Sequence, residues 1–490
     1  MAKIVIIGAG IGGLATANLL AQDGHEVHIY EKNDQLGGRT GQFKKDGFTF
    51  DTGPSWYLMP GVFERYYSLL NTSPAKELDL IKLSPTYKVY SGGEELTLTG
   101  NIDKDAATFE GLEKDAGDSL RAYVKKSTKT YELALKYFLY SNFETPAMFF
   151  KKEVLANSLT MLRLTQMPIH SYVSRYFKNP QLQQILEYAT VFLGSSPYDA
   201  PALYSLMSAL DFNEGVYYPR GTMYAVVESL VKIGEGYGVK YHTHAATTRI
   251  ITNGSKTTGI ELQGGKVVAA DIVISNADLH FTETQLLEPS AQSYPERYWD
   301  KREASPSALL MFLGVEGKVP EFEHHTLLFT DDWRANFDAI FKQKIIPRPA
   351  SIYISKTSGT DTTAPEGFEN IFVLVPLPAG ITLSADEQET LADEYLEQVK
   401  QKTGIDLKSR TRSRTLFGPT QFSEKYNAWQ STMLGPSHKL FQSAFFRTPN
   451  KSKKIDNLFY VGASTVPGIG VPMCLISAEL VRDRIRKVVK

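Results

Sequence analysis

Glycines near the start of the chain have the spacing of a loop that binds the phosphates of a nucleotide. Gly8, Gly10 and Gly13 fit the pattern G-x-G-x-x-G, and Gly12 adds a further glycine to the loop. Glycines at this spacing permit a tight turn, close approach of a pyrophosphate and tight packing of the next helix. Glu31 follows at about the distance where an acidic side chain accepts hydrogen bonds from both ribose hydroxyls. These residues predict a dinucleotide site.

The segments around these glycines have the pattern of a βαβ unit. Residues 4–7 are β-branched and predict a strand, residues 14–20 predict a helix, and residues 27–30 predict a second strand. The N-terminus of the helix would offer free N–H groups and a partial positive charge to the phosphates. The alternative is a plain glycine-rich turn, and the flanking strand, the helix and Glu31 count against it.

A second group of site residues follows Glu31 closely. Gly38 and Arg39 belong to the stretch "GGR", and the alternating stretch "FTFDTG" predicts a strand that ends at Gly53, Pro54 and Ser55. The guanidinium of Arg39 can neutralise a diphosphate that the glycine loop already holds. A surface arginine is the alternative for Arg39.

A third group lies almost at the end of the chain, in "YVGASTVPGIGVPMCLISAEL". Gly462 and Ala463 follow a predicted strand, whereas Gly470, Val471 and Pro472 stand where a predicted helix begins. Glycine allows main chain to approach a ligand closely, and proline fits the first turn of a helix. The stretch is therefore expected to hold part of the same ligand.

Between these groups the sequence predicts an α/β protein of two domains. A Rossmann-like nucleotide-binding domain is expected to be assembled from residues 1–90, 212–284 and 452–490, because strand patterns recur in each segment. Residues 91–211 and 285–451 are rich in aromatic side chains and are expected to form an α+β substrate-binding domain. With no linker-like tract between the domains, we expect the ligand to lie where they pack together.

Composition narrows the class of protein. The chain of 490 residues is 42% hydrophobic and 22% charged, as in a folded globular protein, and 53 basic against 54 acidic residues give no sign of a nucleic-acid partner. Cys474 is the single cysteine, which excludes an intrachain disulfide or a thiolate metal cluster, and we expect no metal site. No apolar run approaches the roughly 18–20 residues that cross a bilayer. We therefore expect a cytoplasmic protein.

One stretch of the predicted substrate-binding domain has the pattern of a membrane-facing surface. Residues 137–177 combine clustered Phe, Tyr, Met and Leu with Lys151, Lys152, Arg163 and Arg175. Apolar helix faces edged by basic residues suit a helix that lies on a bilayer. Ordinary core-facing helices are the alternative. The first interpretation predicts peripheral attachment to the cytoplasmic membrane.

The glycine-rich βαβ unit, "GGR" and "DTGPS" together resemble the flavoprotein superfamily that contains amine oxidases, protoporphyrinogen oxidase and carotenoid desaturases. Within it the chain resembles the bacterial-type phytoene and diapophytoene desaturases most, through stretches such as "FDTGPSWYLMPGVFE", "GVYYPRGTMYAVVESL" and "NLFYVGASTVPGIGVPMCLISA". The stretches occur in the expected order over nearly the whole chain. Thr222, where glycine is usual, and Val466, where histidine is usual, depart from the pattern and bear on the choice of substrate.

This resemblance implies that the dinucleotide is FAD and that the reaction removes two hydrogens from a CH–CH unit of a long apolar isoprenoid, introducing C=C bonds. The electron acceptor would be oxygen or a membrane quinone. It also implies that Gly462 and Ala463 lie at the ribityl and pyrophosphate region and that Gly470 lets the backbone pass the flavin ring. The helix after Pro472 would then direct its positive end to the ring.

The sequence does not single out a catalytic base. His438 is the most attractive ionisable side chain, but a lone histidine is more often a structural hydrogen-bonding group. Cys474 is expected to be a packing residue. Other reactions remain open: isomerisation, saturation or terminal oxidation of a polyene on the same scaffold. Less favoured are an amine oxidase and a non-catalytic prenyl carrier, since the carrier predicts a degraded flavin site.

Overall fold

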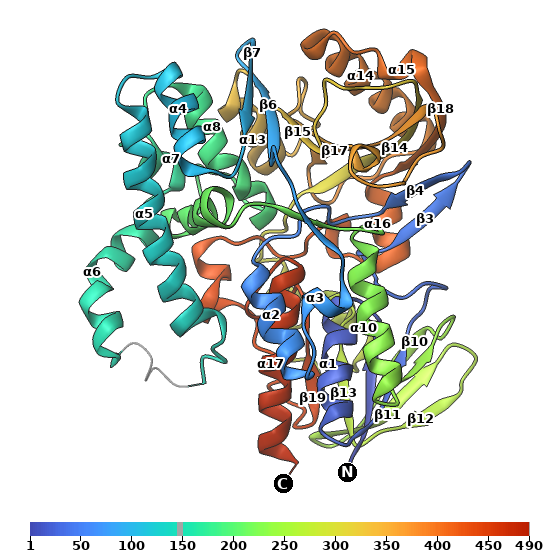
Figure 1. Ribbon diagram of the computed structural model, residues 1–490. Coiled ribbons are helices and arrows are strands. Elements are labelled where there is room, and N and C mark those ends of the chain that lie inside the picture. Colours follow the sequence, from blue (N-terminus) through green and yellow to red (C-terminus); the bar gives the residue numbers. More distant parts are fainter. Residues whose placement is uncertain (145–149, 490) are drawn as a thin grey trace.

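A computed structural model describes residues 1–144 and 150–489, and its lower part in Figure 1 is built on a parallel β-sheet. The sheet has five strands in the order β19-β13-β1-β2-β9. They are β1 (Lys3–Ile7), β2 (Glu26–Tyr30), β9 (Lys240–His242), β13 (Ile272–Ser275) and β19 (Leu458–Tyr460). Segments far apart in the sequence therefore build one sheet, which confirms the predicted α/β class.

Alternate residues of β1 face the two sides of this sheet, as the period of a strand requires. Ile4 and Ile6 pack in one core cluster with helices, whereas Val5 and Ile7 pack against an antiparallel three-stranded meander. The helices are α1 (Ile11–Gln22), α2 (Pro60–Leu69), α10 (Tyr224–Gly236) and α17 (Val471–Val488). The meander consists of β10 (Thr247–Asn253), β11 (Lys256–Leu262) and β12 (Val267–Ala269).

The upper part holds a mixed sheet in the order β18-β14-β17-β16-β15-β6-β7 (Figure 1). Its strands are β6 (Tyr87–Ser91), β7 (Glu94–Leu98), β14 (Ser307–Glu316), β15 (His325–Leu328), β16 (Ile352–Ser355), β17 (Phe368–Leu377) and β18 (Thr411–Phe417). One face packs on α14 (Ala385–Thr403), where Met311 and Leu313 share a core cluster with Leu391 and Tyr395. On the other face, Phe312 and Phe372 pack against Phe48 and Phe50, and Leu310, Tyr353 and Leu374 line a cavity.

Helices form the left-hand side of the molecule in Figure 1. They include α4 (Ile102–Leu112), α5 (Ala116–Ala134), α6 (Lys152–Gln166), α7 (Ile169–Val173) and α8 (Pro180–Glu187). Across residues 1–144 and 150–489, none of the helices has both the length and the apolar character needed to span a bilayer.

Most predicted elements lie close to the observed ones. The helix predicted to begin at residues 470–472 is α17, which begins at Val471, and the strand predicted before Gly462 is β19, which ends at Tyr460. The predicted domain boundary at residue 90 lies inside β6, which pairs with β15 of the upper sheet. The division into two domains stays a prediction, and this pairing favours a boundary before Tyr87.

Thr222, which departs from the family pattern, has a left-handed backbone with φ of 76°. A β-branched side chain is strained there, and glycine would not be. The Thr222 hydroxyl donates to Asp51 Oδ1 (2.7 Å), and the next backbone N–H, of Met223, donates to Asp51 Oδ2 (2.9 Å). These bonds tie the start of α10 to the end of β4 (Phe48–Asp51), and they offset the strain.

Candidate active site

A cavity of about 1100 Å³ extends from the carboxyl end of the parallel sheet to the face of the mixed sheet opposite α14. Every predicted site residue except Gly13 lines it. These lining residues are Gly8, Gly10, Gly12, Glu31, Gly38, Arg39, Gly53, Pro54, Ser55, Gly462, Ala463, Gly470, Val471 and Pro472. The fold thus brings the three groups predicted from distant parts of the sequence to one cavity.

Gly13 lies behind the loop and holds helix and strand together. A Cβ added to it would stand 2.3 Å from the carbonyl oxygen of Gly8. A Cβ on Gly10 or Gly12 would meet the side-chain amide of Asn276, at 2.7 Å and 2.6 Å. Asn276 follows β13 and also lines the cavity, but no motif in the sequence singles it out. Its only sequence signal is its place directly after a predicted strand.

Arg39 is placed for an anionic ligand. Its Nε and Nη2 atoms are buried and have no hydrogen-bond partner among the described residues. A buried guanidinium without partners is costly unless an anion binds to it. Gly38 packs directly on Gly10, since a Cβ on Gly38 would lie 3.2 Å from the Gly10 Cα. The segment that carries Arg39 therefore packs on the glycine loop, and Arg39 lines the same cavity, where a diphosphate group would meet both.

The Glu31 carboxylate is 5% exposed and lines the cavity. The backbone N–H of Ala9 donates to its Oε2 (2.9 Å), and the backbone N–H of Asn33 donates to its Oε1 (2.9 Å). The side-chain amide of Asn33 also donates to Oε1 (2.8 Å), so the open lone pair is on Oε2. Glu31 is therefore fixed in position and still able to accept hydrogen bonds from ribose hydroxyls.

Two helices begin at the cavity. Gly10 precedes the first residue of α1 and Gly470 precedes that of α17, and neither helix has an acidic residue in its first turn. Both positive helix ends are therefore available to a ligand with negative charge. At Gly470 φ is 118°, a conformation that side chains rarely adopt.

His438 supports the loop that precedes α17, and neither of its ring nitrogens is free. The backbone N–H of Ile469 donates to His438 Nε2 (3.2 Å), so Nδ1 carries the proton and faces the Tyr204 hydroxyl (2.9 Å). Burial holds the pKa of His438 well below its usual value. This geometry favours the structural interpretation. Burial also raises the pKa of Cys474 to about 12, as expected of a packing residue.

Val466 does not take part in the cavity wall formed by the described residues. It is 2% exposed and belongs to the core cluster that contains α1 and α17. The replacement of the usual histidine therefore changes the core beneath the loop. Any influence of Val466 on the choice of substrate would therefore be indirect, and that influence stays a prediction.

Away from the glycine loop the cavity becomes an apolar channel. Aromatic and aliphatic side chains line it, among them Trp56, Phe192, Leu310, Leu327, Phe329 and Phe337. Among the described lining residues, the charged ones are Glu31, Lys32, Arg39, Asp278 and Lys425, and they cluster at the nucleotide end. The channel therefore suits a long hydrocarbon and has no carboxylate to bind an amine.

Asp211 lies directly behind the channel wall. The hydroxyls of Tyr87 and Tyr188 donate to its Oδ2 (2.8 Å and 3.1 Å), and Tyr188 lines the channel. Burial raises the pKa of Asp211 to about 7, with the nearby Asp105 adding to the shift. The folded protein thus binds this proton more tightly than the unfolded chain does.

A folded-state pKa above the unfolded value makes stability fall as the pH rises from about 4 through about 7. Asp211→Asn removes this term. We expect the variant to gain about 2 kcal/mol relative to wild type between pH 5 and pH 8, measured by denaturant unfolding at both pH values. Asp51 also has a raised pKa, but it is present in both wild type and Asp211→Asn, so its effect on stability cancels in the difference between them. The control is Asp103→Asn at an exposed site, whose free energy of unfolding relative to wild type should be the same at pH 5 and pH 8. If the difference between Asp211→Asn and wild type were also the same at both pH values, the raised pKa of Asp211 would be contradicted.

The fold and the family comparison define the class of protein. An oxidoreductase from Methanosarcina mazei superposes with a TM-score of 0.63 at 16% identity, covering 98% of this chain and 100% of that one. Wild-type putrescine oxidase bound to putrescine superposes with a TM-score of 0.65 at 14% identity, covering 99% of each. A family model described as flavin containing amine oxidoreductase matches residues 11–485. The chain belongs to this family of flavin enzymes.

Its relatives place it among the carotenoid desaturases. A carotenoid 3,4-desaturase of Haloarcula japonica is 41% identical over 97% of this chain and 96% of that protein. A zeta-carotene-forming phytoene desaturase of Myxococcus xanthus is 32% identical over 99% and 93%. A 4,4'-diapophytoene desaturase of Staphylococcus aureus is 30% identical over 99% of both. These matches confirm the resemblance inferred from the sequence motifs.

Proposed function

We propose that this protein is an FAD-dependent desaturase that introduces C=C bonds into a long apolar isoprenoid, a phytoene-like or diapophytoene-like carotenoid precursor. The observation that carries the proposal is the apolar channel that leads to the glycine loop. A hydrocarbon offers no hydrogen-bonding group, so its recognition depends on the shape and length of such a channel. The named activities of the full-length relatives support the same reaction class.

The cofactor site follows from the residues that line the nucleotide end. Glu31 would accept the ribose hydroxyls, Arg39 would pair with the diphosphate, and Gly8, Gly10 and Gly12 would let the backbone approach it. Gly53, Pro54, Ser55 and the loop from Gly462 to Pro472 would enclose the flavin side. When bound, FAD supplies an acceptor for two electrons and a hydrogen.

The residues of the chain orient the ligands and exclude water from the channel. His438 and Ile469 hold the loop before α17 in place, and the start of α17 directs its positive end into the cavity. The aromatic walls keep water from the channel, which favours transfer of hydrogen over side reactions with solvent. The proposed roles of these residues are binding and orientation.

The direct test is flavin content followed by turnover. The purified protein should be yellow, and incubation with C30 and C40 polyene precursors in liposomes should give products with more double bonds, separated by pigment chromatography. Oxygen and a membrane quinone should be supplied in parallel as electron acceptors. A double-bond count that stays unchanged with every precursor would contradict desaturation, and a rearranged count-neutral product would indicate an isomerase. A colourless protein that takes up no FAD would favour a carrier.

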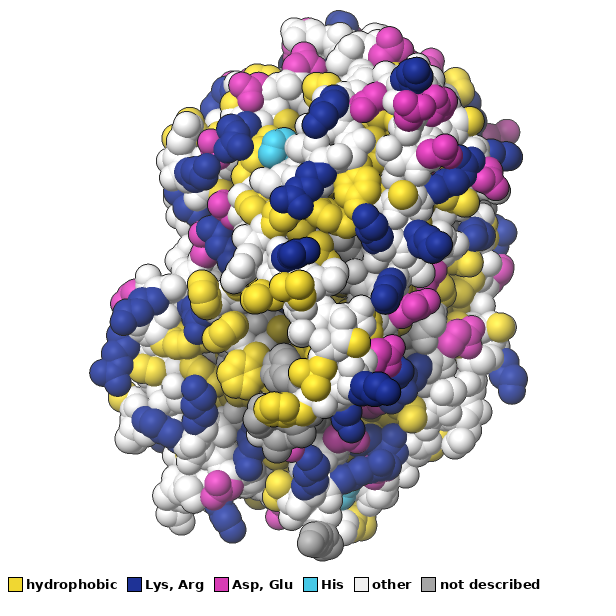
Figure 2. All heavy atoms as spheres, turned by 90° about the vertical axis from the view of Figure 1, so that its left-hand side faces the viewer, with side chains coloured by type: hydrophobic (Ala, Val, Ile, Leu, Met, Phe, Trp, Pro, Cys, Tyr) yellow, Lys and Arg dark blue, Asp and Glu magenta, His cyan; other side chains and the backbone are white. Residues whose placement is uncertain are grey.

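We also propose that the mouth of the channel rests on a membrane. Leu155, Leu159 and Leu162 of α6 are 52%, 61% and 52% exposed, and their spacing puts them on one face of the helix. Leu162 lines the cavity together with the exposed Phe445 and Phe446. In Figure 2 apolar side chains gather around a hollow on this side, and Lys and Arg side chains border them. A lipid-soluble substrate would enter there from the bilayer.

This surface makes a prediction for vesicle binding. Leu155→Glu combined with Leu159→Glu should weaken co-sedimentation with vesicles of anionic and zwitterionic phospholipid at least tenfold, because each exposed leucine contributes on the order of 1–2 kcal/mol on burial. The matched control is Val267→Glu with Ile345→Glu, two exposed apolar residues elsewhere (60% and 53%). Equal binding by both double variants would contradict the assignment.

A further inference from the structure

One wall of the channel is formed by α13 (Trp333–Asp338) and the residues after it. Trp333, Phe337 and Phe341 line the cavity and are 7%, 2% and 7% exposed. The indole N–H of Trp333 donates to Glu187 Oε2 (2.9 Å), which fixes the ring. In contrast to the mouth, this wall is therefore buried.

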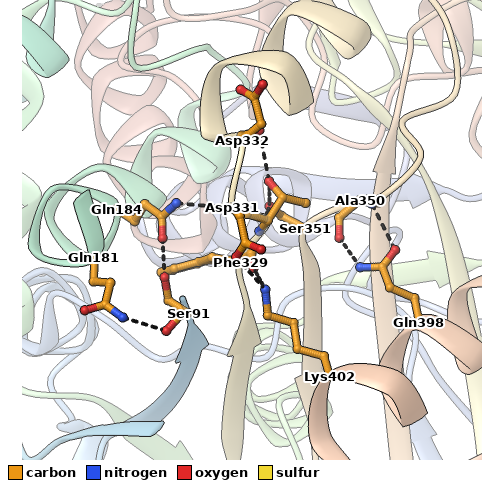
Figure 3. Close-up of polar contacts among 11 residues, drawn as sticks. Ser91, Gln181, Gln184, Phe329, Asp331, Asp332, Ala350, Ser351, Gln398 and Lys402 are labelled. Atoms are coloured by element: carbon orange, nitrogen blue, oxygen red, sulfur yellow. Dashed lines mark hydrogen bonds and ion pairs between the residues drawn. The ribbon is translucent and has the colours of Figure 1, made fainter. Parts of the chain in front are cut away.

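The loop that leads into α13 is held from three sides, as Figure 3 shows. Gln184 of α8 donates to the carbonyl oxygen of Thr330 (2.9 Å), and Lys402 of α14 donates to that of Phe329. The backbone N–H of Thr330 donates to Ser351 Oγ (3.3 Å). Such anchoring makes the wall a rigid boundary for a ligand that fills the channel.

Asn336 carries an unused hydrogen-bond donor in this wall. It is 5% exposed and lines the cavity. The backbone N–H of Ser351 donates to Asn336 Oδ1 (3.0 Å), which settles which side-chain atom is the oxygen. In the described part of the chain no group accepts a hydrogen bond from Nδ2. Nδ2 is not among the fully buried atoms without a partner, so it is open to the cavity, where a ligand can accept its hydrogen bond.

We propose that Asn336 binds an oxygen-bearing end group of the polyene, a hydroxyl or a carbonyl, at this wall of the channel. The proposal rests on the proposed function, since it concerns the same channel and substrate. The other described side chains of this wall are mainly apolar, so they accept the hydrocarbon next to the end group. Holding the end of an extended chain fixes which CH–CH unit lies at the flavin loops. Asn336 thereby sets both the preferred end group and the bond that is oxidised.

The test compares two polyenes of equal length and conjugation in the flavin-loaded protein, one with a plain hydrocarbon end and one with a terminal hydroxyl. Binding is measured by quenching of tryptophan fluorescence and turnover by product chromatography. We expect the wild type to prefer the hydroxylated polyene about tenfold or more. Asn336→Leu should remove the preference and leave binding of the hydrocarbon within about twofold.

Gln398→Leu is the control for an effect on folding alone. Gln398 exchanges two hydrogen bonds with the backbone of Ala350 outside the cavity wall, so its loss should keep the preference. No preference in the wild type, or a preference retained by Asn336→Leu, would overturn the proposal. If the hydroxylated polyene binds more tightly but neither polyene gains double bonds, the end-group site stands and the proposed desaturation fails. If both polyenes gain double bonds but bind equally tightly, the proposed desaturation stands and the end-group site fails.

Discussion

Arg39→Met is expected to purify with little flavin and to bind added FAD at least a hundredfold more weakly than the wild type. Two buried guanidinium nitrogens of Arg39 have no partner among the described residues, and Arg39 lines the same cavity as the glycine loop. Removing one member of a buried ion pair costs about 3 kcal/mol or more, because the other charge loses its counterion. The ratio of flavin to protein absorbance and titration with FAD measure the effect.

The flavin-free protein should be affected much less. Without a bound anion two nitrogens of Arg39 are unsatisfied, and the nearby acidic group is the buried Asp278. The apo form of Arg39→Met should therefore unfold at about the temperature of the wild-type apoprotein, while FAD raises its Tm far less. Arg121→Met is the control, since Arg121 is half exposed and pairs with Asp103 at the surface. Normal flavin content and a normal FAD-induced rise in Tm would show that Arg39 does not bind the diphosphate.

Gly13→Ala is expected to lower the free energy of unfolding by about 3 kcal/mol and to reduce flavin content. The added methyl group would stand 2.3 Å from the backbone oxygen of Gly8, and backbone cannot turn aside as a flexible side chain can. The start of α1 must shift away from β1, which moves the N–H groups that would face the phosphates. Denaturant unfolding and flavin absorbance report the two effects.

Gly111→Ala is the matched control for this substitution. Gly111 lies in α4, and a Cβ there meets no heavy atom within 4 Å. Alanine has the higher helix propensity, so the control should be stabilised by up to about 1 kcal/mol. If Gly13→Ala were as stable as Gly111→Ala, the close contact between position 13 and the backbone oxygen of Gly8 would be contradicted.

Much of the nucleotide end could be predicted from sequence because its signals are local. Glycine spacing, a β-branched strand and the first turn of a helix lie within one continuous segment, so Gly8, Gly10 and Gly12 were found without tertiary information. The same holds for the C-terminal loop, where Gly470 precedes α17. At Val466 the sequence shows a departure from the family pattern, and only the structure shows that this side chain packs in the core.

Asn276 and Asn336 could not be selected in this way. An asparagine after a strand and one within a short helix look like many others along a chain. Asn276 matters because its amide fills the space beside Gly10 and Gly12, far away in sequence. Asn336 stands out because Ser351 engages its oxygen and leaves its nitrogen facing the channel. Both facts depend on contacts between distant segments.

The sequence by itself determined the α/β class, the family, the dinucleotide motif and the residues that surround it, because backbone preference and motif spacing act over short stretches. The tertiary structure decided the rest. It left two buried nitrogens of Arg39 without a partner, engaged both nitrogens of His438, exposed the leucines of α6 and placed Asn336 in the channel wall. Burial and unsatisfied hydrogen bonds are properties of packing between remote segments, and these properties define the proposed substrate site.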